Sequence, residues 1–148
     1  MTGRRLVKLD GPAPPEMKEA LRGAGLPVDD IRDDLARFLR FEDDAGAIGW
    51  AAIEPYGENA LLRSVVILDH RRGEGAGFEM VSEVVRAAAG LGAERLWLLT
   101  EGAAPFFARL GFAAADRNSA PEPIAQTSEF RFCCPASATC MTLNLAAR

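Results

Sequence analysis

A six-residue glycine segment, Arg72-Gly73-Glu74-Gly75-Ala76-Gly77, is the feature that most constrains the fold. It follows residues 60–68 (Ala-Leu-Leu-Arg-Ser-Val-Val-Ile-Leu), whose apolar run is typical of a strand buried on both faces. Residues 78–91 then repeat apolar side chains at helical spacing, and residues 94–100 read as a second apolar strand. The segment therefore predicts a β-α-β unit whose loop is rich in glycine.

The remaining elements place this unit inside a mixed sheet. Further strands are predicted at 4–9, 36–42, 47–55, 112–115 and 140–145, and further helices at about 14–22 and 103–110. Residues 26–34 read as either a turn or a short helix, and one helical turn is expected near 123–126. The order predicts a single α/β (α+β) domain over residues 1–148. Its mixed central sheet has an antiparallel N-terminal half and is flanked by helices.

Charge and hydropathy narrow the classes of partner. The formal net charge of -4 and the pI of about 5.1 argue against a nucleic-acid binder. Neither a dense basic run nor a long apolar stretch is present, so no membrane contact and a cytoplasmic location are expected.

Three cysteines, Cys133, Cys134 and Cys140, lie close together near the C-terminus. An odd number argues against a disulfide framework, and the lack of a Cys-x-x-Cys pair argues against zinc. Three thiolates could bind a trivalent metalloid, although adjacent cysteines on an extended chain face opposite ways. We expect small buried residues and no metal site.

The glycine segment is suited to binding an anion. A helix start exposes unpaired backbone N–H groups, and glycines let a phosphate approach them. A Walker loop would need Gly-Lys-Ser/Thr, and a Rossmann loop would need Gly-x-Gly-x-x-Gly after an early strand; the segment has neither. A plain glycine turn between strand and helix remains the alternative.

Two segments together resemble the GNAT family of N-acetyltransferases. One is Arg72-x-x-Gly75-x-Gly77, which looks like the pyrophosphate-binding signature of that family. The other is residues 106–112 (Phe-Phe-Ala-Arg-Leu-Gly-Phe), which is similar to the family's Phe-Tyr-x-x-Leu-Gly-Phe segment. Residues 60–64, 98–100, 129–131 and 134–141 further resemble the arsenic-resistance N-acetyltransferases.

The resemblance implies acetyl-CoA as co-substrate, a small-molecule amine as acceptor and a homodimeric assembly. It places the pantetheine arm along the strand at 65–67 and the pyrophosphate on the glycine segment. Phe107 stands where many relatives carry a Tyr that serves as the acid for the departing thiolate, so the acid step is in question. The implied cofactor-binding residues are Val65, Val66, Ile67, Arg72, Gly73, Glu74, Gly75, Ala76, Gly77, Phe78 and Phe107.

Candidates for catalysis are carboxylates and one hydroxyl near the ends of the central strands. Glu54 is the first choice for a base, with Glu101 and Glu129 as the others. Thr100 could orient the pantetheine or a water, or it could only cap the next helix. The single tyrosine, Tyr56, is expected in a turn, and His70 in the loop beside the cofactor.

Arg63 is an arginine inside an apolar strand, and an unpaired buried arginine is costly. Its partner could be Glu54. Alternatively, Arg63 could clamp the acidic group of an amino-acid substrate, with Ser64 and Arg131 beside it. The acceptor could then be an arsenic- or phosphorus-containing amino acid. Acetylation of a protein or a polyamine, and a binding module without catalysis, are the competing functions.

Overall fold

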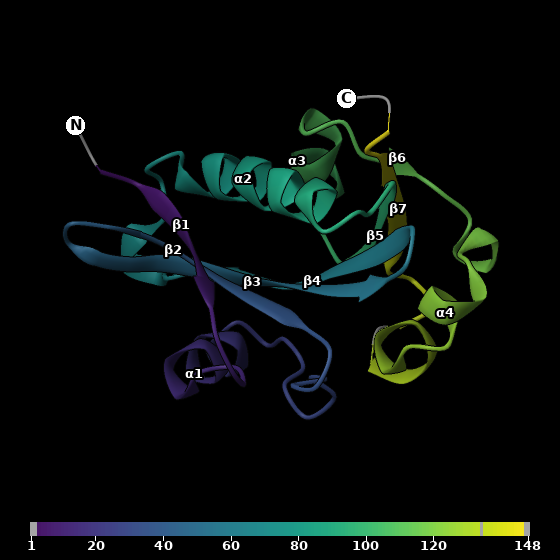
Figure 1. The fold of residues 1–148 in the computed structure, drawn as a ribbon, viewed down its shortest axis with the longest axis horizontal. Coiled ribbons are helices and arrows are strands. Elements are labelled where there is room, and N and C mark those ends of the chain that lie inside the picture. Colours follow the sequence, from purple (N-terminus) through teal and green to yellow (C-terminus); the bar gives the residue numbers. More distant parts are fainter. Residues whose placement is uncertain (1–2, 134, 147–148) are drawn as a thin grey trace.

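The computed structural model describes residues 3–133 and 135–146, and within them one seven-stranded sheet is covered by helices on both faces (Figure 1). The strands are β1 (Arg5–Leu9), β2 (Arg37–Asp43), β3 (Gly46–Tyr56), β4 (Asn59–Ile67), β5 (Arg95–Thr100), β6 (Ala113–Ala114) and β7 (Thr139–Asn144). The α-helices are α1 (Pro15–Gly23), α2 (Ala76–Gly90), α3 (Ala104–Arg109) and α4 (Glu122–Ala125). Shorter 3-10 turns span Asp69–Arg71 and Arg117–Ser119, and a π-helix spans Glu129–Cys133.

The strand order is β1-β2-β3-β4-β5-β7-β6. β4 and β5 pair in parallel through the α2 crossover, whereas the other neighbouring strands pair antiparallel. This confirms the predicted mixed sheet with an antiparallel N-terminal half. β7 lies between β5 and β6, although it follows β6 in the chain, because the 24-residue stretch 115–138 carries the chain around the sheet before it returns.

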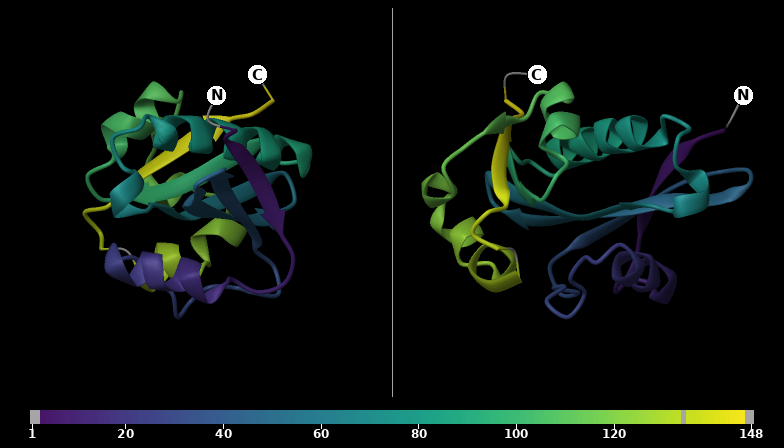
Figure 2. Two further views of the ribbon diagram at one scale, coloured as in Figure 1. Left: turned by 90° about the vertical axis from the view of Figure 1, so that its left-hand side faces the viewer. Right: turned by 180° about the vertical axis from the view of Figure 1, so that it is seen from behind.

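Helices cover the two faces of the sheet in pairs, as Figures 1 and 2 show from three sides. α2 and α3 lie on one face, where Met80, Val84 and Ala88 join the main core with the inward side chains of β3, β4 and β5. α1 and α4 lie on the other face. Met17 and Leu21 of α1 pack near Trp50, as expected from burial of one apolar helix stripe.

Element positions follow the sequence closely, and residues 26–34 form turns, which is one of the two predicted alternatives. α2 begins at Ala76, two residues before the predicted start, because Gly75 ends the loop in a left-handed conformation. The π-helix at Glu129–Cys133 was not predicted. Over the residues described here, every helix is too short or too polar to cross a bilayer.

Candidate functional site

A cavity of about 490 Å³ opens where β4 and β5 separate. The two strands pair only from Asn59 to Leu61 of β4, and beyond that point they diverge. The rest of β4 then has β3 on one side and the cavity on the other. The prediction of a strand buried throughout therefore fails at Val65 and Ile67, which are half-buried because they line this opening.

A β-bulge lies in the free half of β4. Arg63 pairs with Ala52 and Val66 with Trp50, so Ser64 and Val65 together face one residue of β3. Ser64 has φ 57°, the one left-handed non-glycine residue in the described part of the chain. On the opposite edge of β4, pairing with β5 ends at Leu61, so the main-chain groups beyond it have no partner strand on the cavity side.

The glycine loop, residues 72–77, closes the far end of the cavity. Gly73 has φ 83°, and Gly75, the N-cap of α2, has φ 73°; both conformations favour glycine. No side chain caps this helix, so its first N–H groups remain available for an anion. Arg72 and Gly77 line the cavity, and exposed Arg72 pairs with Asp69 at 3.1 Å.

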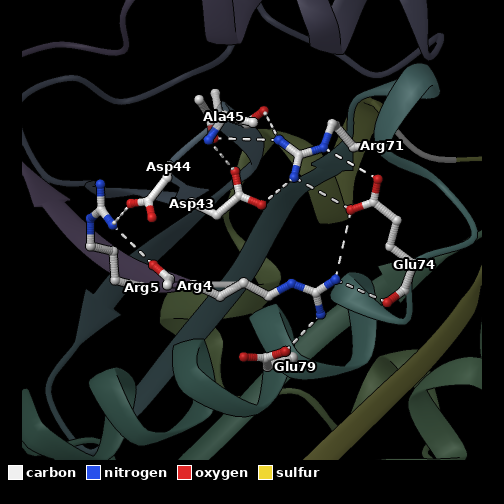
Figure 3. Close-up of polar contacts among 11 residues, drawn as sticks. Arg4, Arg5, Asp43, Asp44, Ala45, Arg71, Glu74 and Glu79 are labelled. Carbon is white, nitrogen blue, oxygen red and sulfur yellow. Dashed lines mark hydrogen bonds and ion pairs between the residues drawn. The ribbon is translucent and has the colours of Figure 1, made fainter. Parts of the chain in front are cut away.

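A buried arginine anchors the glycine loop to the sheet (Figure 3). Arg71 donates to Asp43 at the β2–β3 turn, to both carboxylate oxygens of Glu74 at 3.4 Å, and to the carbonyl of Ala47 at 3.3 Å. Arg4, just before β1, donates to the Glu74 carbonyl at 3.0 Å and to Glu79 of α2 at 2.8 Å. The anchor cluster (Arg4, Asp43, Arg71, Glu74 and Glu79) thus joins four separate parts of the chain.

Asp43 makes the anchor cluster sensitive to acid. The hydrogen bond donated by Arg71 lowers the pKa of Asp43 most strongly; burial opposes it, and the Ala45 N–H adds to it. An Asp in the unfolded chain has a pKa of about 3.9, so the ionised side chain stabilises the fold above that pH. This contribution is lost as the pH falls through the lower folded pKa.

We expect Asp43→Asn to be less stable than the parent at neutral pH, with a difference that shrinks below about pH 4. Urea unfolding at a series of pH values measures it. Asp44→Asn is the matched control, because Asp44 is largely exposed and pairs only with exposed Arg5 among the contacts described. A difference for Asp43→Asn that stays constant across the series would contradict the coupling.

A second cluster contributes two of its side chains, Arg63 and Glu129, to the cavity wall. The Arg63 cluster consists of Arg63, Asp30, Glu54, Glu129 and Tyr56. Arg63 binds Asp30 with both terminal nitrogens, at 2.6 and 2.8 Å, and lies 3.4 Å from Glu54 and 3.6 Å from Glu129. The Tyr56 hydroxyl donates to Glu54 at 2.7 Å. Arg63, Glu54 and Glu129 are all buried.

Protonation follows from these contacts. Burial disfavours the charged form of Arg63, but the Asp30 hydrogen bond and the charges of Glu129 and Glu54 outweigh it and raise the pKa. Burial, together with Glu54, raises the pKa of Tyr56. The cluster therefore holds a charged guanidinium and a protonated phenol that donates to Glu54.

The predicted site residues fall into two groups. Arg63, Ser64, Thr100, Phe107 and the 65–67 strand all line the cavity, as do two of the three candidate bases, Glu101 and Glu129. Glu54 instead lies 1% exposed, held by Tyr56 and Arg63. Arg131 is exposed and donates to Gln126 at 3.3 Å.

Several individual predictions are corrected by the structure. Thr100 does not cap α3, since the N-cap of that helix is Ala103 and it has no side-chain cap. Glu74 and Phe78 lie in the loop and at the helix start as predicted, with the Phe78 side chain 44% exposed and the Glu74 side chain bonded to Arg71, so only their main-chain N–H groups remain candidates for the cofactor. Sequence reasoning also missed Asp30 as a partner of Arg63, although a buried arginine requires one and 26–34 is an acidic segment.

Phe107 packs its ring edge-on against Phe106 and Phe112, with ring centroids 5.1 and 5.6 Å apart. It is 7% exposed, so it serves the core as well as the cavity wall. Cys140 is buried on β7, and burial raises its thiol pKa. Cys134 and the Cys133 side chain lie outside the described residues. Within the described part of the chain, no group of three His, Cys, Asp or Glu side chains is placed to hold a metal ion.

Residues 5–112 match the model of the acetyltransferase (GNAT) family. No curated protein matches the chain in sequence.

Solved structures match over almost all of this chain. An N-acetylglutamate synthase from Neisseria gonorrhoeae, complexed with coenzyme A and L-arginine, aligns with a TM-score of 0.76 at 17% identity over 98% of this chain. The chain spans only 34% of that protein. A GNAT family acetyltransferase from Elizabethkingia anophelis with acetyl-CoA bound aligns at 0.67 and 13% identity, covering 97% and 99% of the two chains. One from Staphylococcus aureus aligns at 0.68 and 12%, covering 96% and 99%.

Proposed function

The chain belongs to the acetyltransferase (GNAT) family, and from this premise we propose that it transfers an acetyl group from acetyl-CoA to the amine of a small molecule. One observation carries the proposal. The free, bulged half of β4 runs along one cavity toward an uncapped helix N-terminus. This arrangement offers main-chain groups to an amide-bearing arm and N–H groups to a phosphate.

The residues present fit acetyl-CoA in both charge and shape. The Val65–Ile67 segment supplies the strand edge for the pantetheine arm, and Gly73 to Phe78 supply N–H groups for the pyrophosphate. Arg72 adds positive charge at the mouth of the cavity. The solved neighbours that contain coenzyme A or acetyl-CoA support this proposal through their shared fold.

The reaction joins the amine nitrogen to the acetyl carbon and breaks the thioester C–S bond, with coenzyme A leaving as a thiolate. The amine must reach the carbonyl unprotonated, so a base on the cavity wall helps. Glu129 and Glu101 line the cavity, whereas Glu54 lies behind it, so we favour Glu129 over the predicted Glu54. Phe107 offers no proton, so the thiolate must take one from solvent or from the acceptor amine.

The acceptor is proposed in two forms. The acidic amine expected from Arg63, including an arsenic- or phosphorus-containing amino acid, requires its acidic group to displace Asp30 or Glu129 from the guanidinium. A cationic amine requires no such exchange. Three carboxylates surround one guanidinium in the Arg63 cluster, which favours a positively charged acceptor.

Thiol release from acetyl-CoA tests both forms with one panel of acceptors. The panel contains glutamate, its arsonous and phosphinic analogues, and polyamines. We expect turnover with one class and a raised melting temperature with acetyl-CoA alone, because a ligand that binds only the folded state stabilises it.

A matched pair of variants ties this result to the glycine loop. Gly77→Glu places a carboxylate among the loop N–H groups and is expected to abolish the acetyl-CoA shift. Ser82→Glu adds the same charge further along α2, outside the cavity lining, and should retain it. No shift in the parent would refute the proposal; a shift without thiol release for any amine would instead favour a cofactor-binding module.

A further inference from the structure

We infer that Arg71 is a positioning residue for the cofactor pyrophosphate, because it holds the Glu74 carboxylate away from the N–H groups of the glycine loop. The inference rests on the proposed function and adds a role for residues that line no part of the cleft between β4 and β5. It assigns this role to the anchor cluster shown in Figure 3.

The glycine loop carries one acidic side chain, Glu74, between two of its glycines. A carboxylate beside a phosphate site repels the anion at short range. Arg71 donates to both carboxylate oxygens of Glu74 at 3.4 Å, and Arg4 lies 3.7 Å from one of these oxygens. The acidic side chain is therefore turned toward the sheet and neutralised there.

Gly73 and Gly75 both have left-handed φ values, so the loop backbone has few constraints of its own. Arg4 holds the Glu74 carbonyl at 3.0 Å, and Arg71 ties the Glu74 side chain to Asp43 and to the Ala47 carbonyl. Glu74 is therefore fixed through its main chain and its side chain, and the N–H groups on either side are fixed with it.

The Arg71 side chain is buried, and its bonds with Asp43 and Glu74 raise its pKa, so the guanidinium stays charged. A buried guanidinium with several acceptors has one preferred orientation. The loop is thus organised before the cofactor arrives, and less ordering remains to oppose binding.

The test compares two probes that differ in phosphate. Coenzyme A is titrated by calorimetry, and pantetheine, which has the same amide arm without phosphates, by amide chemical shifts. We expect Arg71→Ala to weaken the binding of coenzyme A about tenfold and to leave the binding of pantetheine nearly unchanged. Arg71→Ala with Glu74→Gln should regain part of that loss, because the released side chain no longer carries charge. Arg5→Ala is the control, since Arg5 pairs with Glu42 and Asp44 beside the anchor cluster.

Each outcome decides the matter. If Arg71→Ala weakens the binding of both probes equally, or of neither, Arg71 has no positioning role. If the double variant recovers no affinity for coenzyme A, Glu74 does not repel the pyrophosphate. If Arg71→Ala does not fold, Arg71→Lys replaces it. Lysine keeps the charge opposite Asp43 but lacks the planar set of guanidinium N–H donors, so it should show a smaller loss of affinity for coenzyme A and none for pantetheine. A parent that binds pantetheine but not coenzyme A, or neither, would refute the proposed function instead.

Discussion

Replacing Arg63 by alanine is expected to lower the free energy of unfolding by about 3–5 kcal/mol. The guanidinium is buried and is the shared partner of Asp30, Glu54 and Glu129. Its removal leaves these carboxylates close together in a region of low dielectric, where they repel one another. Urea unfolding followed by tryptophan fluorescence measures the loss, since Trp50 and Trp97 are buried.

The matched control is Arg32→Ala. Arg32 also pairs with an aspartate, Asp34, at 2.9 Å, but both side chains are more than half exposed. Solvent screening makes such pairs weak, so little change in unfolding is expected. A parent-like stability for Arg63→Ala would contradict the structural role of the cluster.

Arg63→Lys separates the structural role from a substrate role. Lysine keeps the charge and loses the two-pronged contact with Asp30, so the protein should fold with an intermediate loss of stability. If Arg63 binds an acidic acceptor, the KM for that acceptor rises and the KM for acetyl-CoA does not. An unchanged acceptor KM would leave Arg63 with the structural role alone.

The sequence predicted most of the sheet because local patterns determine most of it. The glycine loop, the amphipathic α2 and the apolar strands on either side each carry a signal of their own length and period. The position of β7 between β5 and β6 carries no such local signal, because it depends on contacts between distant residues. The π-helix at Glu129–Cys133 was missed for a related reason, since an i to i+5 turn has no distinctive sequence period.

The parts of the candidate site that are formed by main chain could be predicted from the sequence. The parts that depend on side-chain pairs between distant residues could not. The loop and the 65–67 segment lie where their positions in the β-α-β unit imply. The orientation of Arg63 depends on Asp30, 33 residues away, and that of Arg71 on Asp43, 28 residues away. Single-residue reasoning identified Arg63 as needing a partner, but it could not choose among the acidic residues of the chain.

Gly49→Ala is expected to destabilise the protein by about 1–3 kcal/mol and to weaken the binding of coenzyme A. Gly49 lies on β3 opposite Ile67 of β4. A Cβ at this position would lie 2.3 Å from the Val66 carbonyl oxygen and 2.9 Å from Ile67 Cδ1. The first contact is with main chain, which cannot rotate away, so β4 itself must move.

The movement of β4 is expected to affect both the stability of the fold and the binding of the cofactor. Val66 and Ile67 line the cavity beyond the bulge, so a shift of β4 moves the strand edge proposed for the pantetheine arm. Gly90→Ala is the matched control: Gly90 ends α2, nothing lies within 4 Å of its added Cβ, and alanine favours the helix by about 0.5–1 kcal/mol. In thermal unfolding and calorimetric titration, Gly49→Ala should therefore lower both the melting temperature and the affinity for coenzyme A, whereas Gly90→Ala should raise the melting temperature slightly and leave the affinity unchanged. If Gly49→Ala binds pantetheine as the parent does, the free half of β4 does not hold the arm, because no cofactor bound along that edge could escape the displacement.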